Sequence, residues 1–292
     1  MNILVTGVNG FIGEKVARKL AETHEVIGMA RSPLKGEAGF RFVKGSFGQT
    51  DDLRRLNGFQ INAVVHLAAV TGGCSEEDGL AVNVQGTGRL FRYLLDNGCR
   101  RFVTASSIAA AGCLDDEFVP LALPIPDDHP CLAKDAYGFS KTMVEELTRY
   151  FHRNHPGTEF VNLRLGSVVE DERWTPPRIE AVERLTLPFV LLARVYASDV
   201  VEGIARIVEA PVKDRVVTCN FVGPDISSNV PAAQVIKSYL GKKAAAFNLE
   251  IYRSREGEFK PLYDIGRLKE EFGFEPAKST RFPAAAETLD SR

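Results

Sequence analysis

Short apolar runs alternate with stretches of helical periodicity through the first half of the chain. Several of the runs are apolar at nearly every position, as strands are in a sheet that helices cover on both faces. This alternation is typical of βαβ units and predicts a parallel sheet. Six strands are predicted, over residues 3–6, 25–30, 41–43, 63–67, 101–105 and 159–164.

Amphipathic helices are predicted between these runs, because apolar residues recur three or four positions apart. Three helices carry the stripes Ile12, Val16 and Leu20; Leu80, Val84, Leu90, Leu94 and Leu95; and Met143, Val144, Leu147 and Phe151. Parallel strands joined by helices cross over right-handedly. The sequence therefore predicts an α/β fold with a doubly wound parallel sheet of the Rossmann type.

The pattern changes after Gly166, where prolines divide the chain into shorter elements. A length of 292 residues also suits two domains of roughly 150 residues each. We therefore expect a dinucleotide-binding domain over residues 1–165. A smaller substrate-binding lobe is expected over residues 166–292, interleaved with the sheet domain.

The composition, with 45% hydrophobic and 25% charged residues, is that of an ordinary globular protein. Its 38 acidic and 36 basic side chains nearly cancel, which argues against a nucleic acid or membrane partner. No apolar run is long enough to span a membrane and no leader is recognisable, so a cytoplasmic location is expected. The five widely spaced cysteines predict buried free thiols and no metal site.

Three glycines fall in the turn between the first strand and the first helix, in Thr6-Gly7-Val8-Asn9-Gly10-Phe11-Ile12-Gly13. Gly7 permits a tight turn, Gly10 lets the backbone approach a pyrophosphate, and Gly13 lets the helix pack closely on the strand. Unpaired N–H groups and the dipole at the helix N-terminus favour the negative charge of a pyrophosphate. The loop therefore predicts a dinucleotide cofactor.

This glycine spacing resembles the opening of the extended short-chain dehydrogenase/reductases, the NAD(P)-dependent epimerase/dehydratase superfamily. Further matches follow in order: His66-Leu67-Ala68-Ala69, Asn83-Val84-Gln85-Gly86-Thr87, Ser106-Ser107, Tyr137-Gly138-Phe139-Ser140-Lys141, Arg164-Leu165-Gly166 and Gly273-Phe274-Glu275-Pro276. Together they span nearly the whole chain. The resemblance implies that the cofactor is bound by Gly7, Asn9, Gly10, Phe11, Ile12, Gly13, Leu67, Ala68, Ala69, Tyr137 and Lys141.

The end of the second strand bears on the choice between NAD and NADP, because a carboxylate there accepts the ribose hydroxyls of NAD. The strand ends instead in Met29-Ala30-Arg31-Ser32. The Arg31 guanidinium can pair with a 2′-phosphate, so Arg31 and Ser32 favour NADP, with NAD as the alternative. The family's Gly-Asp-Leu pattern at the next strand end reads Gly45-Ser46-Phe47, which lacks the aspartate.

A Tyr-x-x-x-Lys pair occurs twice, at Tyr137 with Lys141 and at Tyr239 with Lys243. The second pair contains Gly241 and follows no serine pair, so we assign the chemistry to the first. A phenol has a pKa near 10 and is a poor base near neutrality. An ammonium one turn away favours the phenolate, so Tyr137 can exchange a proton with a substrate oxygen while hydride moves at the adjoining carbon.

By resemblance, Ser107 is the hydroxyl that holds this substrate oxygen. Ser106 is the alternative, because neighbouring strand residues point to opposite faces and only one can face the site. In the family the lysine, here Lys141, also holds the cofactor ribose. Asn83 matches a family asparagine that organises a proton path, and a helix-packing amide is an equal alternative.

Sugar dehydratases of the family carry an Asp-Glu pair after the hydroxyl residue, where this chain has Ile108-Ala109. Members that epimerise two carbons use a Cys and His pair, and no histidine follows His155. Our leading hypothesis is therefore an NAD(P)-dependent oxidoreductase that acts on a sugar-like carbonyl or hydroxyl. The alternatives are a nucleotide-sugar 4-epimerase with tightly bound NAD and a catalytically silent NADP-binding sensor.

In nucleotide-sugar members an arginine clamps the diphosphate seven residues before an aspartate that matches Asp199; Leu192 stands there, and Arg194 is off register. The short stretch before Asp199 predicts a small pocket. A carbohydrate or sugar acid without a nucleotide therefore competes with a nucleotide-linked ketosugar. Arg173, Arg178 and Arg184 are candidates for binding an anionic substrate, although solvated surface arginines are the favoured interpretation.

Besides a small-molecule substrate, a second copy of the chain is the expected partner. The family resemblance implies a homodimer with a four-helix interface, formed by the helices that carry Leu90 to Leu95 and Met143 to Phe151. The same stripes also suit a monomer core, and the sequence leaves both interpretations open.

Overall fold

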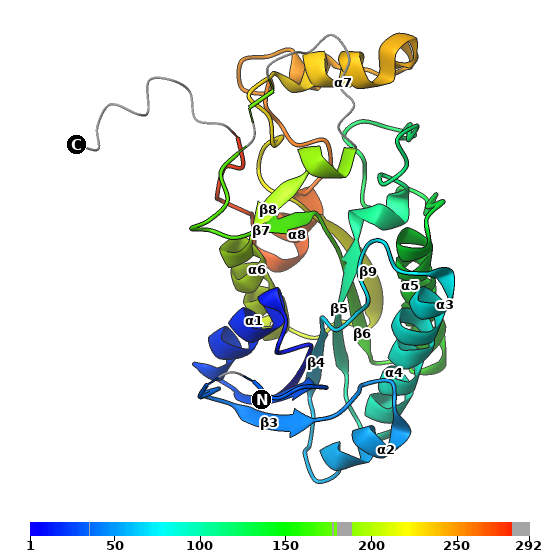
Figure 1. The fold of residues 1–292 in the computed structure, drawn as a ribbon, viewed down its shortest axis with the longest axis vertical. Coiled ribbons are helices and arrows are strands. Elements are labelled where there is room, and N and C mark those ends of the chain that lie inside the picture. The colour runs from blue at the N-terminus through cyan, green and yellow to red at the C-terminus, as the bar shows by residue number, and fades with distance from the viewer. Residues whose placement is uncertain (35, 177, 180–188, 282–292) are drawn as a thin grey trace, which may run out of the picture.

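The computed structural model describes residues 1–292 except 35, 177, 180–188 and 282–292. Its centre is a seven-stranded parallel sheet in the order β3-β2-β1-β4-β5-β6-β9 (Figure 1). The strands are β1 (Asn2–Thr6), β2 (Glu25–Ala30), β3 (Arg41–Lys44), β4 (Ala63–His66), β5 (Arg101–Ser107), β6 (Glu159–Leu165) and β9 (Arg215–Phe221). The strand order reverses between β1 and β4, and ligands of open parallel sheets bind at the carboxyl edge of such a switch point.

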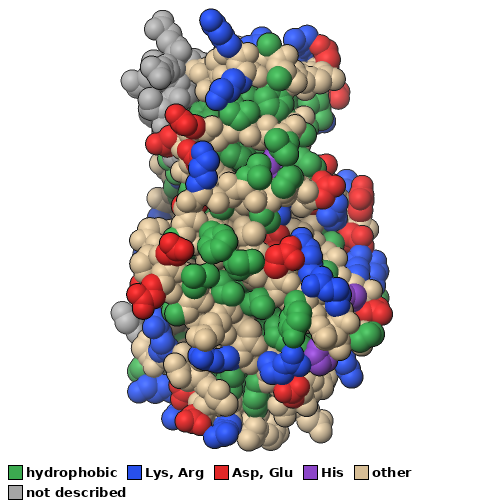
Figure 2. All heavy atoms as spheres, turned by 90° about the vertical axis from the view of Figure 1, so that its right-hand side faces the viewer, with side chains coloured by type: hydrophobic (Ala, Val, Ile, Leu, Met, Phe, Trp, Pro, Cys, Tyr) green, Lys and Arg blue, Asp and Glu red, His purple; other side chains and the backbone are tan. Residues whose placement is uncertain are grey.

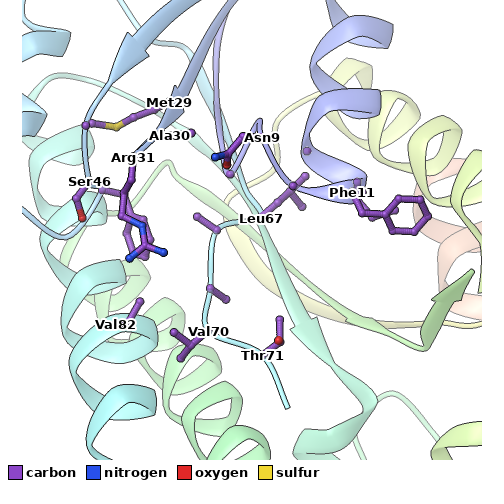
Figure 3. A pocket seen from close by; sticks show the side chains of 18 residues that line it. Asn9, Phe11, Met29, Ala30, Arg31, Ser46, Leu67, Val70, Thr71 and Val82 are labelled. Atoms are coloured by element: carbon purple, nitrogen blue, oxygen red, sulfur yellow. The ribbon is translucent and has the colours of Figure 1, made fainter. Parts of the chain in front are cut away.

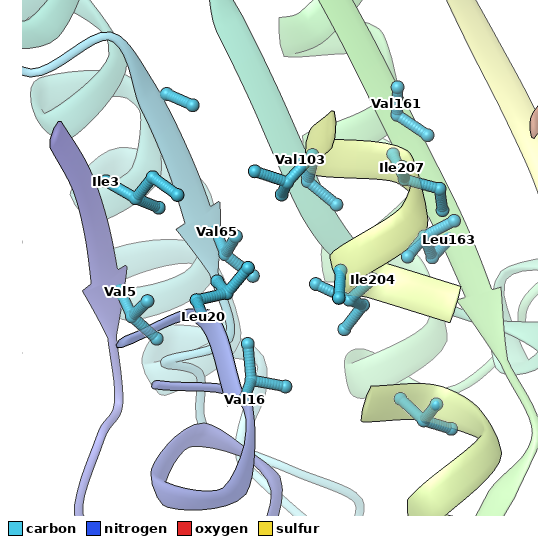
Figure 4. Packing of buried hydrophobic residues seen from close by; sticks show 14 of the residues in the cluster. Ile3, Val5, Val16, Leu20, Val65, Val103, Val161, Leu163, Ile204 and Ile207 are labelled. Carbon is cyan, nitrogen blue, oxygen red and sulfur yellow. The ribbon is translucent and has the colours of Figure 1, made fainter. Parts of the chain in front are cut away.

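Helices cover both faces of the sheet, as Figure 1 shows. On one face α1 (Phe11–Ala21) packs against α6 (Ala197–Glu209). Their apolar stripes meet the β-branched residues of the strands in one buried cluster (Figure 4). Its members include Ile3, Val5, Val16, Leu20, Val65, Val103, Val161, Leu163, Ile204 and Ile207.

The opposite face carries α4 (Thr87–Asp96) and α5 (Ala136–Asn154), with the short α2 (Thr50–Leu53) and α3 (Glu76–Asp78) beside them (Figure 1). Its core is aromatic: the rings of Phe102 and Phe160 stack at 4.5 Å between centroids. Phe91 of α4 meets both rings edge-on or tilted. This aromatic cluster packs α4 and α5 against the sheet and so holds α5 in a defined position relative to the strands.

All six predicted strands are present, with ends that agree to within two residues. The doubly wound parallel fold is confirmed. The sequence pattern did not predict β9, because its run Arg215–Phe221 contains Thr218, Cys219 and Asn220 and follows the proline-rich part of the chain. It is nevertheless buried, since β6 pairs with it along its whole length.

The predicted stripe on the second helix is wrong in its first two turns. Residues Gly79–Gly86 form a π-helix between α3 and α4, labelled η2. A π-turn contains more residues than an α-turn, so the apolar positions drift out of phase. Leu80 is 38% exposed and Val84 is half-buried, whereas Leu90, Leu94 and Leu95 are buried in the core.

A second hydrophobic core lies beyond the carboxyl edge of the sheet, around α7 (Figure 1). It joins residues of the 108–125 segment to residues of the 189–265 segment. Its elements are α7 (Ala232–Leu240) and the short 3-10 turns η3 (Ile108–Ala111), η4 (Phe189–Leu192), η5 (Gly241–Ala246) and η6 (Glu250–Tyr252). The paired strands β7 (Ser167–Val169) and β8 (Arg194–Tyr196) pack instead against the first cluster, through Val168 and Val195. The remaining elements, η1 (Arg54–Leu56) and α8 (Gly266–Phe272), lie beside the main sheet.

None of the helices in the described part of the chain combines the length and apolar composition that a membrane crossing needs.

Candidate active site

The glycine loop joins β1 to α1 at the switch point of the sheet. Gly7 has φ +75°, and a Cβ there would lie 3.0 Å from the backbone of Ala68. A Cβ on Gly13 would lie 2.1 Å from the carbonyl oxygen of Gly7, so α1 begins directly against the loop. Gly10 ends the loop as the N-cap of α1 and offers no side chain to the first-turn N–H groups. The helix N-terminus is therefore free to bind an anionic group.

A cavity of about 390 Å³ opens in front of this loop (Figure 3). Five segments line it: the glycine loop, the end of β2, the turn after β3, the turn after β4, and η2 through Val82. Its lining residues are Gly7, Asn9, Gly10, Phe11, Ile12, Gly13, Met29, Ala30, Arg31, Gly45, Ser46, Phe47, Leu67, Ala68, Ala69, Val70, Thr71 and Val82. The size suits a small-molecule site, and the small, mostly apolar lining suits the flat rings of a dinucleotide.

Most of the predicted cofactor residues line this cavity. The exceptions are Ser32, Tyr137 and Lys141. The Ser32 hydroxyl accepts a hydrogen bond of 2.5 Å from Asn9 Nδ2 and so ties the end of β2 to the glycine loop. Lys141 lies behind the cavity, on a small void that shares Ala68 and Ala69 with it.

Arg31 is the only charged residue among the described residues that line the cavity. Its side chain is exposed at the end of β2, and Figure 3 shows it on the same side as Ser46. The nearby Asp52 carboxylate accepts the backbone N–H of Ser46 at 2.8 Å. The part of the cavity next to Met29 and Ala30 is therefore lined by the Arg31 guanidinium and by no carboxylate among the described residues.

Tyr137 and Lys141 lie one turn apart at the start of α5. The helix begins there because the Asp135 carboxylate accepts the N–H of Gly138 at 2.7 Å. Lys141 Nζ is 5.6 Å from the centroid of the Tyr137 ring and donates a 2.7 Å hydrogen bond to the carbonyl of Ala105. The pair is thus aligned between α5 and the end of β5.

Burial changes the proton affinity of both side chains. It lowers the pKa of Lys141 from 10.5 to about 8. It also raises the pKa of Tyr137, while a hydrogen bond with Ser107 opposes that rise. Near neutral pH Lys141 is therefore charged and Tyr137 protonated, and a proton can pass between the phenol and an oxygen placed beside it.

Ser107, and not Ser106, meets Tyr137. The Ser107 hydroxyl bonds to the phenol and also accepts the N–H of Ala109 at 3.1 Å. Ser106 points to the opposite face and donates a 2.7 Å hydrogen bond to the Glu145 carboxylate. Arg164 holds the same carboxylate with two hydrogen bonds of 2.9 Å. No motif or spacing indicated that Glu145 and Arg164 form a buried pair, because the two residues come together only where α5 packs against β6.

Asn83 secures the wall of the cavity. Its side chain accepts the N–H of Val70 at 2.8 Å and donates to the carbonyl of Val70 at 3.0 Å and to the Ser140 hydroxyl at 2.9 Å. The bond to Ser140 joins η2 to α5, as the helix-packing alternative predicts, and the bonds to Val70 fix the turn after β4 against the same helix. The family's proton-path role for Asn83 stays a prediction.

His66 is a buried structural residue that sequence reasoning assigned no role. Its two ring nitrogens bond to the hydroxyls of Thr6 at 2.7 Å and Thr87 at 2.8 Å. Burial lowers the pKa of His66 to about 3, and the charge of Lys141 adds to the effect. The ring is therefore neutral at physiological pH and links β1, β4 and α4 beneath the cavity.

The second Tyr-x-x-x-Lys pair is not a site. Gly241, with φ 54°, ends α7 between its two members. The Tyr239 hydroxyl donates to the carbonyl of Asp116 at 3.0 Å, and Lys243 is exposed. The two side chains therefore share no helix face.

The structure describes two of the three arginines that were predicted to bind an anionic substrate. Arg173 and Arg178 are exposed, and Arg184 lies outside the described residues. The Arg194 guanidinium lies 5.0 Å from the Trp174 ring centroid. Leu192, at the position of the family's diphosphate clamp, is buried in the second core.

Cysteine burial was only partly as predicted. All five cysteines are free, and Cys99, Cys113 and Cys219 are buried, but Cys74 and Cys131 are only partly buried.

Comparisons with known proteins agree with the resemblance seen in the motifs. The chain is 26% identical over 298 residues to a putative UDP-glucose 4-epimerase of Methanocaldococcus jannaschii, covering 94% of this chain and 93% of that protein. It is 27% identical over 196 residues to an NAD-dependent glucose-6-phosphate dehydrogenase of Haloferax volcanii, covering 60% of this chain and 71% of that protein.

Among solved structures, UDP-glucose 4-epimerase from Bifidobacterium longum in complex with NAD⁺ and UDP superimposes with a TM-score of 0.71 at 18% identity, covering 96% of this chain and 95% of that one. At this identity the likeness supports the fold alone. The model of the NAD dependent epimerase/dehydratase family matches residues 3–185, more than half of the chain. The chain therefore belongs to the NAD dependent epimerase/dehydratase family and is an enzyme.

Proposed function

We propose that the protein is an NAD(P)-dependent oxidoreductase that moves hydride to or from a carbon of a sugar-like substrate. The supporting observation is the set of Ser107, Tyr137 and Lys141 at the carboxyl edge of the sheet, directly behind the wall of the cavity. A nicotinamide dinucleotide supplies the hydride acceptor or donor in this family. The glycine loop fits such a cofactor, because the backbone of Gly7 and Gly13 leaves no space that a Cβ could occupy.

In this proposal the chain's own residues carry the proton and hold the reacting oxygen. Tyr137 exchanges a proton with the substrate oxygen at its phenol. The Ser107 hydroxyl, already bonded to that phenol, holds the same oxygen in place. The Lys141 ammonium, buried 5.6 Å from the phenol ring, stabilises the phenolate that forms when the proton leaves.

Elimination of water is not part of the proposal. Ile108 and Ala109 stand where the family's dehydratases carry an acid and a base, and both are buried apolar residues. Among the described residues, no Asp or Glu lines the cavity. A hydride transfer without water loss needs no such pair.

A nucleotide-sugar 4-epimerase is the second candidate, and the names of the Methanocaldococcus and Bifidobacterium proteins support it. An epimerase takes a hydride and returns it, so it retains its cofactor through each cycle. The two candidates differ in a measurable way. Stoichiometric NAD⁺ released from freshly purified protein supports the epimerase, whereas net oxidation or reduction of added cofactor supports the oxidoreductase.

NADP is the proposed cofactor, with NAD as the alternative. Arg31 supports NADP, because the guanidinium is exposed at the end of β2 and no described ion pair holds it. A thermal-shift comparison tests this choice. NADPH is expected to raise the melting temperature more than NADH at equal concentration; an equal or larger rise with NADH would show that Arg31 does not select the cofactor.

The substrate is proposed to be a sugar or sugar acid that carries no nucleotide. Leu192 supports this choice, because its side chain packs in the second core and offers no charge to a diphosphate. The Haloferax relative, a glucose-6-phosphate dehydrogenase by name, acts on a sugar without a nucleotide. Turnover of free ketosugars, aldoses and uronic acids, set against their nucleotide-linked forms, tests the proposal.

The division of the chain into a dinucleotide-binding domain over 1–165 and a substrate lobe over 166–292 remains a proposal, as does a cytoplasmic location. Two elements of the second part, α6 and β9, pack with the sheet domain, which agrees with an interleaved lobe. The substrate is proposed to bind between the lobe and Tyr137.

A homodimer through α4 and α5 is part of the same proposal. Leu90, Leu94 and Leu95 are buried in the monomer core and are not available to a partner. Other apolar side chains are exposed on these elements: Phe139 is 38% and Tyr150 is 46% exposed on α5, and Leu80 is 38% exposed on η2. Figure 2 shows apolar side chains gathered on this face of the molecule.

A silent NADP-binding sensor is the third candidate. The aligned Ser107, Tyr137 and Lys141 argue against it, because a sensor has no use for a proton donor beside the nicotinamide. Cofactor binding without turnover across a broad panel of carbonyl compounds would favour the sensor.

A further inference from the structure

A small polar void lies behind the cofactor cavity, between the sheet and the helices α4 and α5. Its volume is about 10 Å³, which is room for one water molecule. Polar side chains dominate its wall, namely those of His66, Asn83, Thr87, Thr104 and Lys141. An apolar void of this size stays dry, but a polar one binds a water that completes the hydrogen bonds of its wall.

Thr104 is the wall residue whose hydrogen bonding is incomplete. It lies on β5 opposite His66 of β4 and is 0% exposed. Its Oγ1 has no hydrogen-bond partner among the described residues. The other polar wall residues are bonded, since His66 holds Thr6 and Thr87, and Asn83 holds Val70 and Ser140. A buried hydroxyl without a partner lowers the stability of the fold, so a partner is expected in the void.

Lys141 is the second wall residue with unused capacity. An ammonium has three N–H donors, and one described hydrogen bond uses one of them, to the carbonyl of Ala105. The groups that face Lys141 are Tyr137 and Glu145 on its own helix, the neutral His66 ring on β4 and the thiol of Cys74. The Glu145 carboxylate is already bonded to Ser106 and Arg164, so it gives Lys141 no direct hydrogen bond.

We propose that Thr104 holds one buried water against Lys141 Nζ, and that this water solvates the ammonium and keeps it charged beside Tyr137. The water accepts an N–H of Lys141 and bonds to Thr104 Oγ1, which satisfies both groups at once. Thr104 is then a positioning residue that acts through Lys141, and its catalytic consequence rests on the function proposed above. It touches neither substrate nor cofactor.

The direct test is a crystal structure of the full chain at high resolution, together with titration of Lys141 by NMR on protein labelled with ¹³C at the lysine ε-carbon. We expect a density peak within about 2.7–3.2 Å of both Lys141 Nζ and Thr104 Oγ1. An empty void in such a structure would refute the proposal without any variant. The titration is read without substrate, so an error in the proposed function leaves its outcome unaffected.

Variants separate the hydroxyl from packing. In Thr104→Val the water loses a partner, and we expect the pKa of Lys141 to fall by roughly one unit further, since less solvation favours the neutral amine. Thr104→Ser keeps the hydroxyl and is expected to titrate as the wild type does. Thr218→Val on β9 removes a buried hydroxyl that lies two strands away from Thr104 and outside the wall of the void, and it serves as the matched control.

A second route covers the case in which Thr104→Val does not fold. Val144 of α5 also lines the void, so Val144→Ile fills it and displaces the water while Thr104 stays. The same downward shift is expected, with a parallel shift in the basic limb of the pH profile of kcat. An unchanged Lys141 titration in either folded variant would show that no water solvates the ammonium.

Discussion

Ser106 and Ser107 are neighbours on β5, yet they face different surroundings. Ser107 bonds to Tyr137, and Ser106 bonds to the Glu145 carboxylate that also holds Arg164. We expect Ser107→Ala to lower kcat/KM by about 100-fold, as loss of one donor to a reacting oxygen does, with little change in melting temperature.

Ser106→Ala is the matched control, and the opposite result is expected. It removes a buried hydrogen bond to a charged group and is expected to lower the free energy of unfolding by about 1–3 kcal/mol while kcat changes less than threefold. Steady-state kinetics and chemical denaturation of both variants give the comparison. If Ser106→Ala proved the catalytically damaging change, the assignment of the two hydroxyls would be reversed.

Burial of the charged Lys141 side chain lowers the free energy of unfolding. Its pKa falls from 10.5 in the unfolded chain to about 8 in the fold, which corresponds to a folding cost of about 3 kcal/mol near neutral pH. Lys141→Met removes that cost, so the variant is expected to be more stable than the wild type at pH 7 and to lose activity.

The sign of the pH dependence follows from the lowered pKa. The extra stability of Lys141→Met is complete below pH 8 and fades between pH 8 and 10.5, where the wild-type lysine loses its proton in the fold before it does so in the unfolded chain. Denaturation curves at pH 7 and pH 10 measure it. A difference that stays constant over this range would contradict the lowered pKa.

Tyr137 and Lys141 were named from the sequence because a catalytic pair on one helix has a fixed spacing. Ser107 was named by family resemblance, with Ser106 as the alternative. His66 and its partners Thr6 and Thr87 were not assigned a role, because they meet only where β1, β4 and α4 converge.

At the scale of elements, β1 and α1 can join closely only because Gly13 has no side chain. A Cβ on Gly13 would lie 2.1 Å from the Gly7 carbonyl, and the contact is backbone, which cannot rotate away. We expect Gly13→Ala to lower the free energy of unfolding by about 1–3 kcal/mol and to weaken cofactor binding, because the loop must shift.

Gly88 provides the control for this prediction. It lies in α4, where a Cβ would meet its nearest neighbour, Leu147, at 3.9 Å. Gly88→Ala is therefore expected to be neutral or stabilising, by up to about 1 kcal/mol from helix propensity. Thermal and urea denaturation, with cofactor titration, compare the two variants. If Gly13→Ala and Gly88→Ala had equal free energies of unfolding, the glycine loop would be able to move away from α1 at no cost, contrary to this prediction.

Strands could be predicted from sequence because their apolar runs are buried on both faces, which leaves an unbroken signal. The π-helix at Gly79–Gly86 could not, since its extra residues shift the stripe in a way that the apolar pattern alone does not show. Strand β9 was missed for a different reason: its polar residues are buried by contacts from distant segments, such as the bonds of Asn220 to Asp127 and Ile125.

At the scale of the whole molecule, the proposed homodimer depends on the outward side chains of α5. Phe139 and Tyr150 are exposed apolar residues of α5. Figure 2 shows apolar side chains on this side of the molecule. Phe139→Glu with Tyr150→Glu is expected to convert a dimer into a folded monomer, because two charges would be buried at the contact.

Ile251→Glu is the matched control, since Ile251 is 39% exposed and lies on η6, an element of the second core, and not on α5. It is expected to leave the mass unchanged in light scattering coupled to gel filtration. A wild-type chain that is already monomeric, or a double variant that stays dimeric, would rule out this face as the interface.

The central claim is that Tyr137 exchanges the proton that accompanies hydride transfer. The most direct measurement is the rate of absorbance change at the reduced nicotinamide band, for wild type and Tyr137→Phe with a confirmed substrate, alongside the Kd of the cofactor for each. We expect Tyr137→Phe to react at least about 100-fold more slowly while its cofactor Kd changes less than threefold. A Tyr137→Phe rate equal to that of the wild type would contradict the account.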